Sequence, residues 1–217
     1  MSLLSFQKAL TDLIASPQLC LQMRTNPADI LPRYDLTDRE KARLQAVVHQ
    51  PGMSVSCTLY RVNRITPIYT MLPYTCFLLG PALVSQAETF WQVQQKSDLQ
   101  FKREITLFGE FLLQQIDAGI LINPYLREIV AMELAINELN FLPREALLNA
   151  PLNEQGIHPL VRFIPFDHSP EVLLTALASM QQPSIVLQKD AYWLVIDHRE
   201  EEISFSTLPR INGAVAV

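Results

Sequence analysis

The residues with the clearest chemical potential lie together at the start of a long apolar segment. Tyr60, Arg61, Asn63 and Arg64 open this segment, which ends at Gly80. Core segments seldom begin with a cluster of hydrogen-bonding side chains. A buried arginine needs a carboxylate or several carbonyls, because an unpaired charge in a low dielectric is costly. The cluster therefore predicts a fixed structural hub or a recognition surface, and it has no obvious catalytic pattern.

Glu133 is the second residue of chemical interest, because it lies on the apolar stripe of a predicted helix, three residues after Val130. A bare carboxylate in such a place would shift its pKa upward or find a cation. We expect an internal ion pair with Arg61 or Arg64 that joins two helices. The alternative is that Glu133 acts as a general base inside a cleft.

The histidines and cysteines form no recognisable metal-binding or nucleophilic motif. The histidines share no short spacing with one another or with a cysteine. The chain also lacks the GxSxG elbow, the P-loop and the GxGxxG loop. We therefore predict a protein without a metal or cofactor of its own and without enzymatic activity. The four histidines are His49, His158, His168 and His198.

The composition is that of an ordinary globular protein. Hydrophobic residues make up 49% and charged residues 18% of the 217 positions, which is far from the composition of a disordered chain. The chain has 6 glycines against 15 prolines. This balance favours helices and strands bounded by prolines, with few of the loops that cradle phosphates.

The charge distribution disfavours nucleic acid as a ligand. The formal net charge is −5. From Leu152 onward, four basic side chains stand against eight acidic ones, which gives −4 there and leaves −1 for the preceding residues. Neither part carries the basic stripe that phosphate binding requires.

The cysteines and the N-terminus predict a cytoplasmic protein. Cys20, Cys57 and Cys76 are widely spaced in apolar surroundings, which is typical of reduced, packed thiols. The chain opens directly into an amphipathic pattern, so we expect no signal peptide. No apolar run approaches the roughly 18–20 residues of a membrane-spanning helix.

Apolar residues at helical spacing predict a mainly helical part up to about residue 150. Thr37 and Glu40 predict a capping box at the start of a helix that stops at Pro51. Gly80-Pro81 predicts the end of one helix and the start of the next, and Asn123-Pro124 predicts a further start. Helices are expected over about residues 3–14, 37–50, 55–72, 81–91, 102–116 and 124–137.

The hydrophobic period changes beyond residue 160 and predicts a small sheet. Strands are expected over about residues 161–164, 184–187, 192–196 and 203–205, with a short helix capped by Ser169 after the first. Asn, Pro and Gly concentrate between Asn149 and Pro159, which predicts a domain boundary. The expected fold class is α+β. A mainly helical domain covers 1–150, and a small mixed domain at 151–217 holds a three- or four-stranded sheet.

Short motifs occur in a particular order between residues 59 and 139. They are Tyr60-Arg61-x-Asn63, Leu72-Pro73, Leu78-Leu79-Gly80, Phe90, Phe108-Gly109-x-Phe111-Leu112, Pro124-Tyr125-Leu126 and Met132-Glu133-Leu134-Ala135. This order resembles a bacterial family described by a DNA-binding domain of unknown function. Its members are commonly encoded beside multinuclear non-heme iron oxidases of the TIM-barrel type. The partner proteins of methanobactin and related peptide pathways belong to the same broad group.

The resemblance implies a noncatalytic partner protein in the biosynthesis of a modified ribosomal peptide. The helical domain would dock on a TIM-barrel non-heme iron oxidase, which holds the iron. The C-terminal domain would hold the leader of the precursor peptide as an added strand. The alternative is a DNA-binding transcriptional regulator that uses the helical domain. A purely structural subunit of another complex is a third possibility.

The predicted strands supply the candidate peptide contacts. The alternating large side chains of Tyr192–Ile196 are typical of sheet core, but a nearby edge strand at Ser184–Leu187 could stay open and accept an added strand. Arg162 and Arg199 are candidate partners for an acidic leader. The predicted peptide-binding residues are Ser184, Ile185, Val186, Leu187, Tyr192, Trp193, Arg162 and Arg199.

Overall fold

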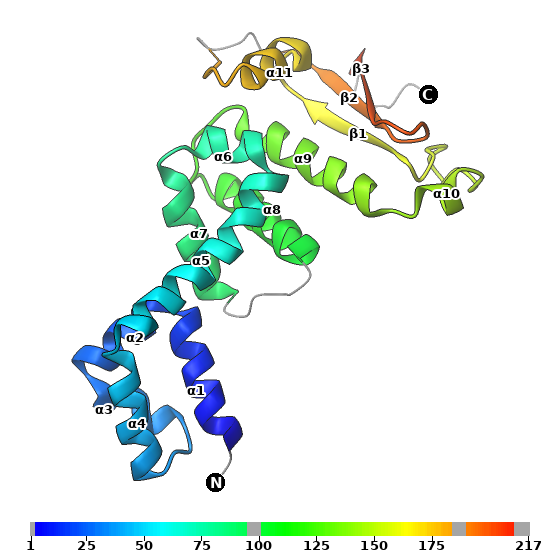
Figure 1. Ribbon diagram of the computed structural model, residues 1–217. Helices are drawn as coiled ribbons and strands as arrows, with labels where there is room; N and C mark the ends of the chain where they lie inside the picture. Colours follow the sequence, from blue (N-terminus) through cyan, green and yellow to red (C-terminus); the bar gives the residue numbers. More distant parts are fainter. Residues whose placement is uncertain (1–2, 95–100, 184–189, 211–217) are drawn as a thin grey trace. The chain divides into compact units, whose positions relative to one another are not determined.

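The computed structural model describes residues 3–94, 101–183 and 190–210 (Figure 1). Helices make up 64% of the described residues, and the described strands form one three-stranded antiparallel sheet. The prediction of a mainly helical α+β fold is therefore confirmed.

Contacts within the chain define two compact units. The first unit contains Met1–Pro67 and Ala87–Leu99, and the second contains Ile68–Gln86 and Gln100–Val217. The boundary predicted between residues 149 and 159 stays a prediction. The first strand after it packs on the last long helix before it, and both belong to the second unit.

The first unit is built from short helices with clear sequence signals at their starts. Ser16 caps the second helix by accepting the Leu19 N–H at 3.3 Å, with Pro17 in the first turn. Thr37 and Glu40 form the predicted capping box. The helices are α1 (Leu3–Ala15), α2 (Pro17–Thr25), α3 (Pro27–Ile30), the 3-10 turn η1 (Leu31–Arg33), α4 (Asp38–Val48) and most of α5 (Pro51–Met71).

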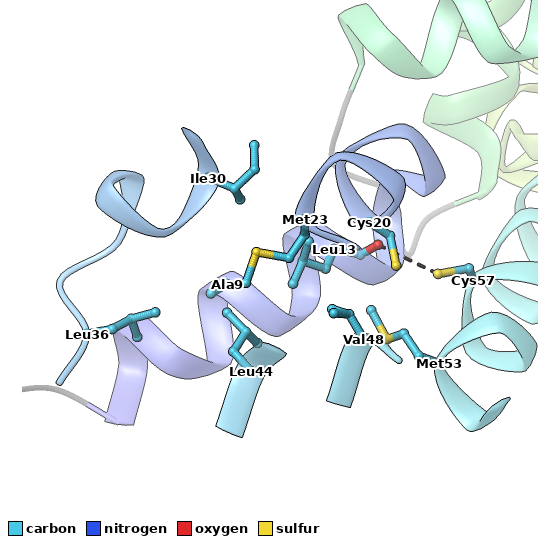
Figure 2. Packing of buried hydrophobic residues seen from close by; sticks show 10 residues of the cluster. All are labelled: Ala9, Leu13, Cys20, Met23, Ile30, Leu36, Leu44, Val48, Met53 and Cys57. Carbon is cyan, nitrogen blue, oxygen red and sulfur yellow. Dashed lines mark hydrogen bonds between the residues drawn. The ribbon is translucent and has the colours of Figure 1, made fainter. Parts of the chain in front are cut away.

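Apolar side chains from these helices meet in one core (Figure 2). Two of its thiols, Cys20 from α2 and Cys57 from α5, are buried and free. The Cys57 thiol donates a hydrogen bond to the Leu13 carbonyl at 3.7 Å, and burial raises its pKa to about 11. The core residues are Ala9, Leu13, Cys20, Met23, Ile30, Leu36, Leu44, Val48, Met53 and Cys57.

Helix α5 begins earlier than predicted. Pro51 and Gly52 were expected to end the preceding helix, but α4 already ends at Val48 and Pro51 opens α5. The reason is that proline lacks the N–H that is unsatisfied anyway in the first turn, so it can start a helix as well as stop one. The helix continues past Pro67, as predicted.

The second unit contains α6 (Pro73–Leu79), α8 (Phe101–Asp117), α9 (Leu126–Phe141) and α10 (Arg144–Leu147), while α7 (Ala82–Val93) is divided between the units. Gly80 ends α6 with a φ of 49°, as its predicted role as a stop requires. Helix α9 begins at Leu126, slightly later than Asn123-Pro124 predicts. Asn123 instead accepts the Tyr125 N–H at 3.0 Å and fixes the turn that leads into the helix.

Helices α8 and α9 approach closely at Gly109. A Cβ atom added there would lie 2.7 Å from the terminal methyl groups of Leu134. The missing side chain therefore lets the two helices pack face to face.

Strands β1 (Val161–Phe166), β2 (Tyr192–Asp197) and β3 (Ser204–Pro209) form the sheet in the order β1-β2-β3. Ile164 lies opposite Leu194, and Leu194 lies opposite Thr207. Helix α9 packs on β1 (Figure 1), and α11 (Pro170–Ala178) follows β1. The predicted strands at 161–164 and 192–196 and the helix after Ser169 are confirmed, but the Ser169 side chain makes no capping hydrogen bond with the described residues. The last strand lies one residue later than 203–205 and is longer.

Candidate peptide-binding site

Both faces of the sheet carry buried side chains. Antiparallel register and side-chain alternation place Ile164, Leu194 and Ile196 on one face, where all three are buried. Ile164 lines a cavity together with residues of α9, so this face lies toward the helix. The other face carries the buried Val161 and Val195 and the half-buried aromatic side chains of Phe163 and Trp193.

Strand β3 is an exposed edge strand. All six of its residues are exposed, and within the described residues it pairs with β2 alone. Its sequence contains no charged residue, and its only proline is the last position, Pro209. Proteins commonly protect such edges with charges, prolines or bulges. An unprotected edge of this length is suited to pairing with an added strand.

A groove of about 750 Å³ lies beside the face that carries Phe163 and Trp193. Phe163 and Trp193 line it, and their rings meet edge to face with centroids 6.4 Å apart. The segment before β1 supplies Ile157, His158 and Pro159. The indole Nε1 of Trp193 is buried and finds no acceptor among the described residues.

The structure brings together only some of the predicted peptide contacts. Arg162 and Trp193 line the same groove. Tyr192 lies at the other end of β2 from Asp197, and its hydroxyl donates to Asp190 at 3.0 Å, which raises its pKa. The predicted contacts at Ser184, Ile185, Val186 and Leu187 lie outside the described residues. The exposed edge that is described is β3, which the sequence prediction did not single out.

The two predicted arginine contacts are already engaged within the chain. Arg162 makes two hydrogen bonds to Glu138, at 2.8 and 3.1 Å, and also binds two carbonyl oxygens. Arg199 binds Asp197 through its Nε at 3.0 Å, which lowers the pKa of that carboxyl. Arg199 remains 56% exposed, so a peptide carboxylate could still reach it, whereas Arg162 is held more firmly.

Glu133 has a different partner from the one predicted. Instead of pairing with Arg61 or Arg64, it accepts the backbone N–H groups of Tyr74 and Thr75, at 2.8 and 2.9 Å. These N–H groups lie in the first turn of α6, where they have no partner within the helix. The N-cap residue is Leu72, and its apolar side chain cannot accept a hydrogen bond from them. Glu133 thus caps α6 from another helix. Burial outweighs these bonds and raises the pKa of Glu133 to about 7.

The two arginines bind other groups. Arg61 pairs with Glu88 on α7. Arg64 is 3% exposed, donates to the Gln94 carbonyl at 2.9 Å and lies 5.1 Å from the ring centroid of Trp91. All of these residues belong to the first unit. Carbonyl and aromatic partners therefore join Glu88 in binding the two arginines.

A buried histidine–carboxylate pair was not predicted from the sequence. Glu128 on α9 and His168 after β1 are 4% and 2% exposed, and their Oε1 and Nδ1 atoms are 2.9 Å apart. Burial raises the pKa of Glu128, against the opposing effect of the Asp167 N–H and of His168. The available signal was an acidic residue two positions after the start of a largely apolar helix, but its partner lies 40 residues away.

Among the described residues, no group of three or more His, Cys, Asp or Glu side chains could hold a metal ion. None of the helices described combines the length and apolar character needed to cross a bilayer. Comparison of the chain with protein-family models and with curated proteins found no match.

Proposed function

We propose that this chain is a noncatalytic partner protein that binds an extended peptide along the free edge of β3. The observation that carries the proposal is the exposed, uncharged strand with its proline only at the end. An added strand would gain main-chain hydrogen bonds from β3 and side-chain contacts from the exposed Phe205 and Leu208. The adjacent groove, lined by the rings of Phe163 and Trp193, would take further contacts of the same peptide.

The enzyme that receives the peptide is proposed to be a multinuclear non-heme iron oxidase of the TIM-barrel type. Support for this step is the resemblance of the ordered motifs between residues 59 and 139. The peptide would then be the ribosomal precursor on which the oxidase acts, and the iron would belong to the oxidase. Because this chain would supply binding alone, its own residues need no catalytic geometry.

The competing role in DNA binding has less support. Arg61 and Arg64 already have partners within the first unit, and Lys41 lies 3.1 Å from Asp38. Affinity for duplex DNA depends on cations that are free to neutralise phosphates and release counterions. Arg61, Arg64 and Lys41 are therefore less available for phosphate contacts.

The first test is capture of partners from the native cells, followed by a peptide-binding assay. The tagged chain should recover an iron oxidase, and peptides encoded nearby should bind the purified chain. The Phe205→Ser variant should weaken peptide binding about tenfold, which corresponds to about 1.4 kcal/mol. Val172→Ser is the matched control, because Val172 and Phe205 are 52% and 51% exposed but Val172 lies on α11.

Two results would contradict the proposal. One is recovery of nucleic acid without an oxidase, together with an affinity for duplex DNA that falls linearly with salt on logarithmic scales. The other is peptide binding that Phe205→Ser and Val172→Ser weaken equally, since the peptide would then not lie along β3.

A further inference from the structure

The turn that follows β1 makes hydrogen bonds to residues beside the start of β2 and the end of β3. Asp167, which follows β1, accepts the Asp190 N–H on its carbonyl at 3.0 Å, just before β2. Its carboxylate accepts a hydrogen bond from Arg210, just after β3, at 2.7 Å. The Arg210 N–H binds the Ala191 carbonyl at 2.8 Å, and its guanidinium lies 5.7 Å from the ring centroid of Trp193. The position of this turn therefore affects both β3 and the groove.

The turn is attached to α9 through Glu128. The Oε1 atom of Glu128 accepts the Asp167 N–H at 2.8 Å and lies 2.9 Å from His168 Nδ1. The ring of Tyr125 meets the imidazole edge to face, with centroids 4.8 Å apart. Both side chains of the pair are almost fully buried.

The second oxygen of Glu128 has no such partners. Oε2 is buried and makes no hydrogen bond with any described residue. When the pair holds one proton, as carboxylic acid with imidazole or as carboxylate with imidazolium, its net charge is zero. When that proton leaves, one negative charge stays buried, and part of it resides on an oxygen without a donor, which is costly.

The surrounding charges do not compensate for this loss. Asp167 pairs with Arg210 through its carboxylate, and its charge raises the pKa of Glu128. Tyr125 presents an aromatic ring. Arg210 is a cation that contacts the turn, and it is already bound to Asp167.

We propose that the Glu128–His168 pair is a pH-dependent switch for this end of the sheet, and that it controls peptide binding at β3 and the groove. The control of peptide binding rests on the proposed function, while the switch itself does not. With one proton the pair holds the turn on α9. As the pH rises and the proton leaves, the turn loosens, and Asp167, Arg210 and Trp193 lose their fixed positions.

The direction follows from linkage. A carboxyl group whose folded-state pKa is raised stabilises the folded turn at low pH, and this stabilisation is lost as the pH rises through that pKa. The equilibrium constant for local opening should therefore rise with pH wherever the open state has lost the proton and the folded state still holds it. The rise there is up to about tenfold per pH unit.

The experiment measures hydrogen exchange and tryptophan fluorescence between about pH 5 and 9. The chain contains two tryptophans, so a Trp91→Phe background leaves Trp193 as the reporter. The protection factor of the Asp167 amide should fall with pH, and the emission of Trp193 should titrate in parallel. Glu128→Gln should abolish both effects, while His198→Asn, at the other end of β2, should leave them unchanged.

Each outcome decides the matter. A protection factor and a Trp193 signal that do not change with pH would overturn the switch, as would a titration that survives in Glu128→Gln. If that variant does not fold, His168→Asn keeps a donor toward Glu128 but removes the imidazole, and it should shift the titration. If no peptide binds but the titration follows the pair, the proposed function fails and the switch stands. If peptide binds equally at all pH values without a titration, only the switch fails.

Discussion

Replacing Glu133 by glutamine should remove a pH dependence from the stability of the second unit. The folded-state pKa of Glu133 is raised from 4.5 to about 7, so the folded protein holds this proton more tightly than the unfolded chain does. The resulting stabilisation is complete below the lower value and is lost as the pH rises through about 7. The glutamine variant has no proton to lose at this position.

The magnitude follows from the two pKa values. Between about pH 5.5 and pH 8, proton loss from Glu133 should lower the free energy of unfolding by about 2 kcal/mol, since a tenfold difference in proton affinity corresponds to about 1.4 kcal/mol. Glutamine keeps one carbonyl oxygen for the N–H groups of Tyr74 and Thr75 and loses the other acceptor. The Glu133→Gln substitution itself should therefore lower the free energy of unfolding by about 1–3 kcal/mol at low pH and by less at high pH.

The assay is urea unfolding at several pH values, followed by the fluorescence of Trp193 in a Trp91→Phe background. Trp193 belongs to the second unit, so its signal reports on the unit that contains Glu133. Glu138→Gln is the matched control on the same helix. Arg162 lowers the pKa of Glu138. The contribution of Glu138 to stability is therefore lost only when the pH falls below the ordinary pKa of a glutamate, and it should not change between pH 5.5 and 8.

Two results would refute this reasoning. An unchanged pH dependence in Glu133→Gln would mean that the carboxyl group does not exchange a proton in this range. A wild-type stability that rises with pH, and a rise that the variant loses, would mean that the two N–H bonds outweigh burial and hold the carboxylate ionised.

Three further substitutions test the packing and the caps. Gly109→Ala should destabilise the second unit by about 1–3 kcal/mol in urea unfolding, because its methyl group would meet Leu134 at 2.7 Å; no loss would show that Leu134 moves freely. Thr37→Ala should cost the first unit about 1 kcal/mol by removing the acceptor for the Glu40 N–H, with circular dichroism as the readout. Asn137→Ala should cost about 1–3 kcal/mol, because it leaves the last carbonyl of α5 without the donor that binds it at 2.7 Å. Retention of full stability there would imply that water replaces the amide.

Local sequence signals predicted the elements well because their causes are local. The capping box at Thr37 and Glu40 and the glycine stop at Gly80 are short-range arrangements of backbone and side chain. Pro51 was misassigned because proline is compatible with both the end and the first turn of a helix. Local information could not separate those two uses.

The sequence predicted the unusual position of Glu133 but not its partner. Periodicity places the carboxylate on an apolar stripe, and a cation is the usual expectation there. The observed partners are backbone N–H groups 58 and 59 residues away, at the start of a helix whose own N-cap cannot bind them. A main-chain donor is present at nearly every position, so no residue type reveals it in advance.

Glu128 was overlooked for a related reason. The apolar periodicity of a helix predicts one buried face. Glu128 lies outside the face that contains Ile129 and Glu133. In the structure α9 packs on β1 as well as on α6 and α8, so a second side of it is buried. Which strand would cover that side depends on the tertiary fold.

The two buried carboxylates of α9 allow a last test of how this helix organises the second unit. Glu128 and Glu133 are five residues apart, about 7.5 Å along the axis, and the contacts described give them no shared partner. Both have raised pKa values, so both should lose stabilisation as the pH rises. If they act independently, the double variant Glu128→Gln/Glu133→Gln should lose the sum of the two single pH dependences, within about 0.5 kcal/mol. A larger deviation from this sum would mean that the whole of α9 moves when either carboxyl group loses its proton. The switch at the sheet would then extend to the cap of α6.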